Sequence, residues 1–243
     1  MTIHVRPTAA LAERALLPED PGVAMAIAQA LLDKPVMFNH SRGLWGYTGE
    51  AADGRPLTVQ STGVGAPSAA VVLEELIRLG LRRAVRVGTC AGLDPTLGLG
   101  DLVIAESALA AEGTSLGLLP GTERAAADPE LCARLRAAAP ELRHGLVAST
   151  DRFYAPTGPG RWAGSDGGAG WRAAGALAVE LGTAALFGIG ARRGVPIACV
   201  LTVTDLIGPH EAVEAADVGG ADLALSVLAC GGGAPRSRVP NVG

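Results

Sequence analysis

Short apolar runs alternate with longer helical patterns along most of this sequence. The run at 197–204 is rich in β-branched residues and has the length of a buried strand. The segment 67–79 repeats apolar residues at helical spacing, with Pro67 near its start and Gly80 at its end. The pattern predicts strands at 57–62, 84–88, 102–106, 145–149, 176–180 and 197–204, and helices at 67–79, 129–138, 183–193 and 211–230. Strands that alternate with helices predict a three-layer α/β domain.

The length of the chain allows one sizeable domain with a full core. It has 243 residues, of which 49% are hydrophobic, and this composition excludes a disordered chain. We expect a single domain over 1–230, followed by a disordered tail over 231–243 that is rich in Gly, Pro and Arg. The Gly- and Pro-rich segment 155–170 is expected to form a mobile loop.

The bulk properties exclude several classes of function. A net charge of −4 and a pI near 5.6 give no electrostatic footprint for nucleic acid. No run reaches the roughly 18 apolar residues of a membrane span, and the first residues have no signal-peptide pattern. The four cysteines, Cys90, Cys132, Cys199 and Cys230, have neither zinc nor redox spacing. We expect a cytoplasmic protein with no metal site, no cofactor, and no nucleic-acid or membrane partner.

A polar turn follows the apolar strand at 84–87. It reads Arg86-Val87-Gly88-Thr89-Cys90-Ala91-Gly92 and is followed by Gly100-Asp101-Leu102-Val103-Ile104. Such a turn exposes backbone N–H groups and a threonine hydroxyl beside an arginine. This chemistry suits an anion or a polar heterocycle.

Other short motifs occur in a consistent order. They are Arg42-Gly43 with Gly46-Tyr47-Thr48-Gly49, Gly63-Val64-Gly65 with Pro67-Ser68, Gly113-Thr114-Ser115, Ser149 to Tyr154, Val179-Glu180, and Leu201 to Asp205. Together with the turn at 86–92 they resemble the nucleoside phosphorylase family, which includes bacterial purine nucleoside and uridine phosphorylases. The resemblance covers most of the chain. It implies an α/β/α fold with a central mixed sheet, and a homo-oligomer with a dimer as its unit and a hexamer as the family expectation.

The resemblance also implies roles for individual residues. Arg86 and Thr89 match phosphate ligands, Phe153 matches an aromatic residue that stacks on the base, and Asp205 matches an aspartate that acts as general acid in the purine branch. Glu180 matches the first glutamate of a VEME motif. Two residues match groups that reach a neighbouring subunit, namely His4 at its sugar site and Arg42 at its phosphate.

Several family positions are altered in this chain. The family's PGDPxR motif reads Pro18-Glu19-Asp20-Pro21-Gly22-Val23, so Glu19 replaces a glycine and Val23 replaces an arginine that bind phosphate. A carboxylate beside a phosphate would repel it, and loss of the arginine removes a strong phosphate contact. Gly182 stands where the second VEME glutamate would hold both ribose hydroxyls. Val218 falls near a family arginine that assists the general acid.

These changes remove charge from the expected pocket and favour a larger, less polar ligand. We therefore hypothesise a repurposed enzyme of specialised metabolism that acts on an apolar non-nucleoside molecule, by cofactor-independent cyclisation, cycloaddition or isomerisation. Two alternatives are a nucleoside phosphorylase or hydrolase with a rebuilt site, and a ligand-binding protein without turnover. We assign catalytic roles to Asp205, Arg86 and Glu180, and substrate binding to Thr89, Cys90, Phe153, Tyr154, Leu181, Gly182, Val23, Gly65, His4, Arg42 and Val218.

Structural roles remain open for several of these residues. Arg86 could brace the end of its strand, Glu180 could form a structural ion pair, and Asp205 could cap a turn or helix. Cys90 could be a small buried side chain rather than a nucleophile, since no paired base is visible. His4 could be solvated unless a neighbouring subunit covers it.

Overall fold

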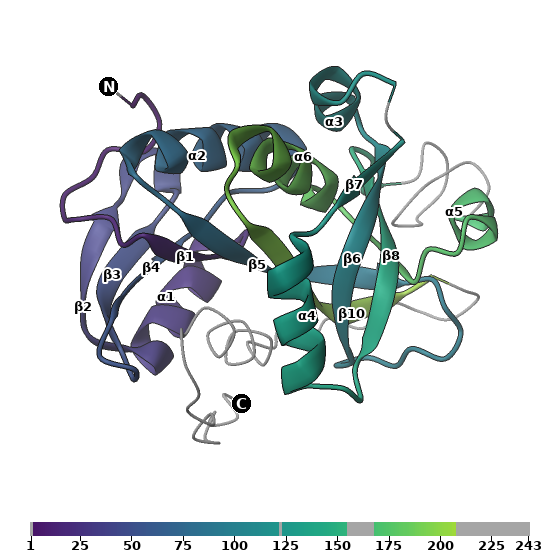
Figure 1. Ribbon diagram of the computed structural model, residues 1–243, viewed down its shortest axis with the longest axis horizontal. Coiled ribbons are helices and arrows are strands. Elements are labelled where there is room, and N and C mark those ends of the chain that lie inside the picture. The colour runs from purple at the N-terminus through teal and green to yellow at the C-terminus, as the bar shows by residue number, and fades with distance from the viewer. Residues whose placement is uncertain (1, 122, 155–167, 208–243) are drawn as a thin grey trace.

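The computed structural model describes residues 2–121, 123–154 and 168–207 (Figure 1). Its strands belong to one ten-stranded sheet. They are β1 (Arg14–Leu17), β2 (Leu32–Asn39), β3 (Gly46–Ala51), β4 (Pro56–Gln60), β5 (Arg83–Gly92), β6 (Leu102–Ala111), β7 (Arg124–Ala126), β8 (Arg143–Thr150), β9 (Ala178–Glu180) and β10 (Ile197–Leu206). β1 pairs in parallel with β4 and β5, whereas β3 pairs antiparallel with β2 and β4. The prediction of an α/β fold around a central mixed sheet is confirmed.

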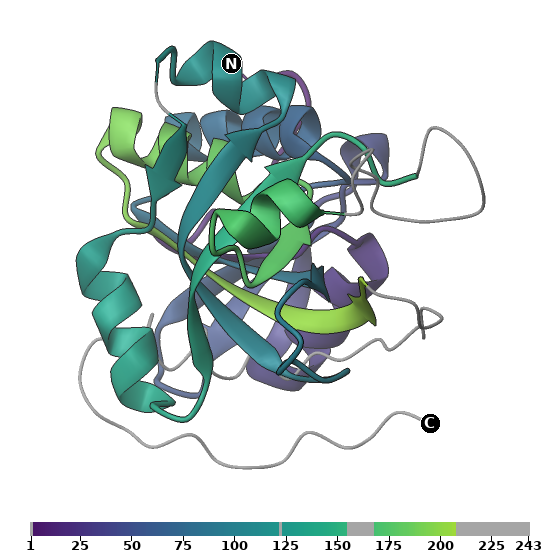
Figure 2. The same ribbon diagram turned by 90° about the vertical axis from the view of Figure 1, so that its right-hand side faces the viewer.

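One half of the sheet closes on itself. The strand order is β10-β6-β8-β9-β5-β1-β4-β3-β2, with β7 added to β6, and β10 also pairs with β5. β10 therefore lies between β5, to which it is parallel, and β6, to which it is antiparallel. Five strands form this circuit, and β1, β4, β3 and β2 extend it to one side. Figure 2 shows the strongly twisted strands of the circuit, with α4 at one side and α5 in front.

Helices cover both faces of the sheet. They are α1 (Pro21–Leu31), the short 3₁₀ helix η1 (Ser41–Gly43), α2 (Ala66–Leu79), α3 (Gly113–Leu118), α4 (Pro129–Ala138), α5 (Ala169–Ala173) and α6 (Thr183–Arg193). α2 and α6 pack against each other on one face, and α1 and α4 lie on the other (Figure 1). α2 ends at Gly80, whose φ of 111° lies in the left-handed region that glycine adopts without strain.

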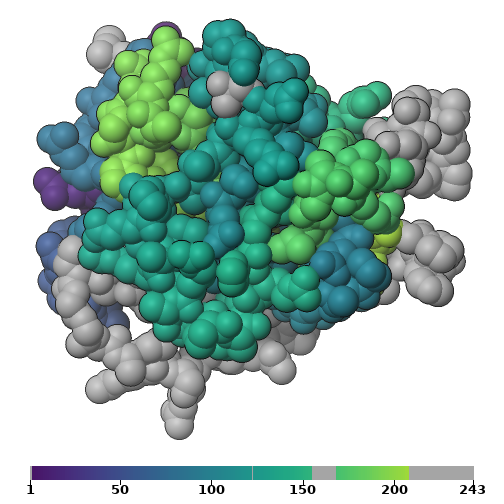
Figure 3. All heavy atoms as spheres, turned by 45° about the vertical axis from the view of Figure 1, so that its right-hand side comes forward, coloured from purple at the N-terminus to yellow at the C-terminus, as the bar shows by residue number. Residues whose placement is uncertain are grey.

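The core is built from small and medium aliphatic side chains. Leu16, Leu73, Ile104 and Val200 are fully buried in the main cluster, and burying each such side chain contributes about 1.5–3 kcal/mol. A second, smaller cluster surrounds β9, with Phe153 packed against it. The space-filling view shows that side chains of the segments from β6 to α6 cover most of one face (Figure 3).

The predicted elements agree with the structure where their pattern is strong. The helices expected at 129–138 and 183–193 are α4 and α6, the helix at 67–79 is α2, and the predicted strands lie within or beside β4, β5, β6, β8, β9 and β10. Several elements have no counterpart among the predicted ones, namely β1, α1, β2, β3, α3, β7 and α5. The expected helix 211–230, the tail 231–243 and most of the loop 155–170 lie outside the described residues. Within the described ranges, no helix is long and apolar enough to span a membrane.

Candidate active site

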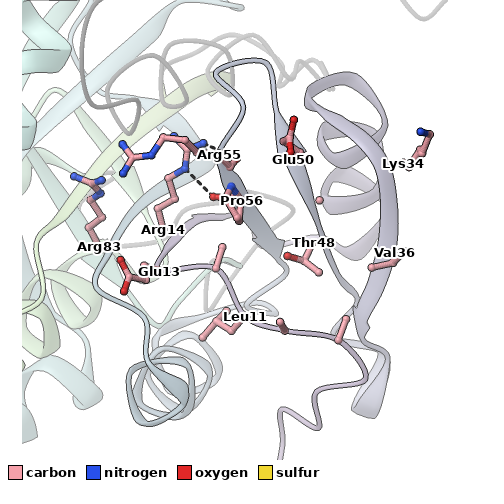
Figure 4. Close-up of a pocket in the computed structure, with 14 residues that line it drawn as sticks. Leu11, Glu13, Arg14, Lys34, Val36, Thr48, Glu50, Arg55, Pro56 and Arg83 are labelled. Atoms are coloured by element: carbon pink, nitrogen blue, oxygen red, sulfur yellow. Dashed lines mark hydrogen bonds between the residues drawn. The ribbon is translucent and has the colours of Figure 1, made fainter.

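Two hollows lie at opposite ends of the parallel strands. The larger, of about 670 Å³, lies at the amino ends of β1, β4 and β5 (Figure 4). Arg14, which lines it, donates hydrogen bonds of 2.6 and 2.7 Å to Asp53 and of 2.9 Å to the carbonyl oxygens of Arg55 and Pro56. Lys34 lies far from the arginines, on the other side of the hollow (Figure 4). The Arg14 guanidinium is therefore already engaged within the fold.

The smaller hollow, of about 450 Å³, lies beside Thr89 in β5, Leu181 just after β9, and Thr204 and Asp205 near the carboxyl end of β10. Ligands of α/β sheets bind outside the carboxyl ends of the strands, and cavities of about 300–1,000 Å³ are typical of small-molecule sites. The residues that line it are Glu19, Val64, Thr89, Phe153, Tyr154, Leu181, Thr204 and Asp205. Hydroxyl and carboxylate groups thus share one cavity with apolar and aromatic side chains, and we take this cavity as the candidate active site.

Glu19 reaches the cavity because of where β1 ends. Leu17, the last residue of β1, pairs with Arg86 of β5, so the chain leaves the sheet beside this arginine. The N–H groups of Thr62 and Gly63 donate to the carbonyl oxygens of Pro18 and Glu19 at 2.8 and 3.0 Å. These bonds hold the segment after β1 against the end of β4.

The Glu19 carboxylate is paired with a buried arginine. Its Oε1 accepts a hydrogen bond from Nη2 of Arg86, and the same Nη2 donates to Oε2 of Glu180 at 3.1 Å. Arg86 is only 1% exposed. Burial alone would lower the pKa of Arg86, but the two carboxylates outweigh that effect and raise the pKa above its ordinary value. Arg86 therefore stays charged, and Glu19 stands between it and the cavity.

Glu180 is enclosed by protein donors at the start of α6. Besides Arg86, it accepts hydrogen bonds from the Ser149 hydroxyl and from the backbone N–H groups of Gly182 at 2.8 Å and Thr183 at 2.9 Å. A helix N-terminus leaves such N–H groups without partners, and a carboxylate there is stabilising. Gly182 is the N-cap residue and supplies no side-chain cap. Glu180 therefore fulfils the structural reading that the sequence left open.

Asp205 reaches the cavity at an irregularity in β10. The register of β10 against β5 shifts between Val203 and Asp205, and such bulges redirect a side chain at the end of a strand. The Asp205 side chain accepts a 3.3 Å hydrogen bond from the Thr204 hydroxyl and is 7% exposed. Thr89 contributes a further hydroxyl from the second half of β5.

Two aromatic rings form one wall. The rings of Phe153 and Tyr154 meet edge to face, with centroids 4.9 Å apart and planes at 84°. Phe153 also packs against the buried cluster around β9, whereas Tyr154 is 72% exposed. Phe153 is therefore the better supported of the two rings and the better candidate to contact a flat ligand.

The structure brings part of the predicted site together. Asp205, Thr89, Phe153, Tyr154 and Leu181 all line the cavity. The other predicted residues of the same chain do not line it, namely Arg86, Glu180, Cys90, Gly182, Val23 and Gly65.

Each of these excluded residues has a structural reason for its place. Val23 lies in the first turn of α1 and packs against the main core. Gly65 precedes α2 with a φ of 84° and leaves its neighbour Val64 to line the cavity. Cys90 is fully buried, and burial raises the pKa of its thiol well above the ordinary value. The reading of Cys90 as a buried filler fits these observations better than a substrate contact.

The two residues expected to act across an interface lie apart from the cavity lining. His4 is tied to its own chain, since Nδ1 lies 3.1 Å from Oε1 of Glu75. Arg42 lies in η1 with a left-handed φ of 59° and an exposed side chain. Val218 is outside the described residues.

Three lining residues escaped the site prediction. Val64 and Thr204 lie inside the motifs Gly63-Val64-Gly65 and Leu201 to Asp205, but the sequence analysis assigns neither of them to the site. The sequence marks Glu19 as an altered position but does not predict its pairing with Arg86. The one signal for that pairing is the negative charge of Glu19, which a nearby cation stabilises.

Comparisons with known proteins agree with this geometry. Residues 13–229 match the Phosphorylase superfamily. A purine nucleoside phosphorylase of DeoD type from Caldanaerobacter subterraneus is 35% identical over 222 residues, which is 88% of this chain and 92% of that protein. A uridine phosphorylase from Treponema pallidum is 38% identical over 202 residues, covering 77% and 75% of the two chains.

This chain belongs to the Phosphorylase superfamily. The comparisons support an enzyme of this family with a small-molecule substrate. They give no support to a cyclase of natural-product metabolism. A further relative, a purine nucleoside phosphorylase of DeoD type from Geobacillus kaustophilus, is 35% identical over 214 residues, covering 85% of this chain and 87% of its own length.

Proposed function

We propose that this superfamily member cleaves the N-glycosidic bond of a nucleoside in the cavity that Thr89 of β5, Leu181 after β9 and Asp205 of β10 line. The observation that carries the proposal is that Asp205, Thr89 and Phe153 line one cavity of suitable size. The printed names of two relatives, a purine nucleoside and a uridine phosphorylase, support the same bond as the target.

Each of these groups has a role in such a cleavage. Phe153 supplies a flat apolar surface for the base. Asp205 donates a proton to the base as the bond from the sugar to the base nitrogen breaks, which makes the base a better leaving group. Thr89 offers a hydroxyl that can donate to or accept from the sugar. These roles use only side chains that already line the cavity.

The test is an assay of the purified protein against purine and pyrimidine nucleosides, with release of free base as the readout. The proposal is supported if the wild type releases free base and the Asp205→Asn variant releases it much more slowly. The matched control is Asp33→Asn, because the Asp33 side chain is 74% exposed on β2. Absence of base release from every nucleoside would refute the proposal.

A second candidate is the cyclisation or isomerisation of an apolar non-nucleoside molecule. The observation that favours it is the apolar share of the lining, to which Val64, Leu181, Phe153 and Tyr154 contribute. It predicts that apolar molecules co-purify with the protein while nucleosides neither bind nor react. A ligand-binding protein without turnover would bind such a molecule and release it unchanged.

We further propose that the chain acts as a homo-oligomer with a dimer as its unit. The exposed Arg42 and the partly exposed Trp45 beside η1 support an interface on this surface. Sedimentation of the wild type against Arg42→Ala and Trp45→Ala would test this. A monomeric wild type at assay concentration would overturn it.

A further inference from the structure

The charged side chains that line the candidate active site are acidic. Glu19 and Asp205 both line the cavity, and none of its described lining residues is Lys, Arg or His. An inorganic phosphate ion in this cavity would approach two acidic side chains without meeting a cation from the described lining. Contact between like charges weakens binding, so the two acidic side chains disfavour a phosphate ion in this cavity.

The nearest cation is already engaged by Glu19. Of the Arg86 guanidinium nitrogens, Nη2 makes both hydrogen bonds, one to Glu19 and one to Glu180. Nε and Nη1 are buried and have no hydrogen-bond partner among the described residues. A buried guanidinium with unmet donors binds an available carboxylate or phosphate strongly. In this chain Glu19 already holds Nη2 from within the fold, at the side of the guanidinium nearest the cavity wall.

The position of Glu19 is fixed by its backbone as well as by its charge. The segment that carries it is held by the hydrogen bonds from Thr62 and Gly63. Oε1 faces Arg86, and Oε2 has no hydrogen-bond partner within the described ranges. The Glu19 side chain is 18% exposed, which fits a group at the cavity wall.

We propose that Glu19 is a built-in anion that takes the place of an anionic co-substrate on Arg86, so that the reaction of this site uses water instead of phosphate. The inference rests on the proposed cleavage of an N-glycosidic bond for its chemical step. For the exclusion of phosphate it rests on the pairing of Glu19 with Arg86 and on the acidic lining of the cavity.

The chemical step balances with water as the only co-reactant. The oxygen of water forms a bond to the anomeric carbon of the sugar as the bond to the base nitrogen breaks. The electron pair of the broken bond leaves with the base, which receives a proton from Asp205. Glu19 accepts one proton from the water and favours the positive charge that develops on the sugar. The products are free base and free sugar, and proton exchange with solvent restores both carboxyl groups.

The first experiment measures binding of inorganic phosphate by calorimetry. We expect no saturable binding by the wild type or by the control Glu141→Gln, whose glutamate is exposed. Glu19→Gly exposes Arg86 and should raise phosphate affinity by at least about tenfold. Glu19→Gln keeps the shape of the side chain without its charge, so it reports on the proposal if the glycine variant does not fold. Phosphate binding by the wild type, or none by either folded variant, would overturn the inference.

The second experiment separates this inference from the proposed function. Base release from nucleosides is measured in phosphate-free buffer and at millimolar phosphate, with the reaction run in ¹⁸O-labelled water. Equal rates and labelled free sugar are expected. Phosphate-dependent release of a sugar phosphate would overturn the inference and leave the proposed cleavage standing. If no nucleoside releases free base, the proposed cleavage is refuted. The phosphate titrations then still decide whether Glu19 acts as the internal anion.

Discussion

The hydroxyl of Ser149 donates a hydrogen bond to the carboxylate of Glu180 on the neighbouring strand, and its oxygen accepts one from the N–H of Ala184 at 2.9 Å. The two side chains together satisfy the first N–H groups of α6, although they belong to β8 and β9. The helix that covers one face of the sheet therefore begins on side chains from two strands. Glu180 links this cap to Arg86 and thus to the wall of the candidate active site.

Ser149→Ala should destabilise the fold without altering the surface of the cavity. The change removes one donor to Glu180 and the acceptor of Ala184, both of which are buried. Loss of a buried hydrogen-bond partner costs about 1–3 kcal/mol, and denaturant unfolding followed by circular dichroism measures it. Ser107→Ala on β6 is the matched control, since no side-chain hydrogen bond joins Ser107 to the described residues. Equal stability of the two variants would contradict the capping role.

Glu75→Gln should remove a pH-dependent part of the stability. Burial alone would raise the pKa of Glu75, but the N–H groups of Val5, Ile3 and His4 and the His4 ring lower it from 4.5 to about 2. A lowered pKa stabilises the folded state above the unfolded pKa, and this stabilisation is lost as pH falls toward the folded pKa. The expected advantage of the wild type is therefore constant near neutral pH and shrinks as pH falls from 4.5 toward about 2.

The size of this effect follows from the shift. Each pKa unit corresponds to about 1.4 kcal/mol, so the free energy of unfolding of the wild type should exceed that of Glu75→Gln by at most about 3–4 kcal/mol at neutral pH. Unfolding free energies at several pH values measure the difference. Glu141→Gln is the control, because Glu141 is exposed. A difference that stays the same down to the lowest pH would show that the charge of Glu75 does not stabilise the fold.

Asp205→Asn and Phe153→Leu should change different kinetic constants. Loss of a general acid lowers kcat by about a hundredfold or more, whereas loss of a stacking ring raises KM by about tenfold with a smaller effect on kcat. Steady-state kinetics on whichever nucleoside is active separates the two effects. An Asp205→Asn variant with wild-type kcat would exclude Asp205 as the proton donor.

The buried cysteines should resist modification in the folded protein. Cys90 and Cys199 are fully buried, and burial raises the pKa of the Cys199 thiol to about 12. Since the thiolate is the reactive form, neither residue should react with iodoacetamide at neutral pH until the protein is unfolded. Peptide mass spectrometry before and after denaturation identifies the labelled positions. Rapid labelling of Cys90 in the native protein would contradict its placement in the core.

The elements that the sequence predicts well are helices with clear end residues and strands with continuous apolar runs. α2 and α6 end at Gly80 and Gly194, both in the left-handed region, so their limits were readable from the sequence. β1 has four residues, too few for a periodic pattern. β2 contains Asp33, Lys34 and Pro35, which break the alternation expected of a strand. Pairing with β3 forms this strand despite its weak local preference.

The candidate site divides along similar lines. The sequence pattern places Thr89 and Asp205 just after two strands, and in the structure both residues line the cavity from within β5 and β10. The sequence also marked Glu19 as a carboxylate at a position that disfavours phosphate. It did not reveal that this carboxylate pairs with Arg86, since the two lie 67 residues apart and meet through the β1–β5 pairing. The hydrogen bonds to the Glu180 carboxylate likewise come from β8 and from the start of α6, which only the fold brings together.

The insertion of β10 between β5 and β6 has a consequence for how the protein is made. Synthesis proceeds from the amino terminus, so β5 and β6 are complete before the chain that fills the space between them exists. Contacts of such long sequence separation form slowly, and unpaired strand edges invite association with other chains in the meantime. Asp205 is carried by this last described strand. During synthesis, Asp205 therefore reaches the candidate active site in the same late step that pairs β5 and β6 with β10.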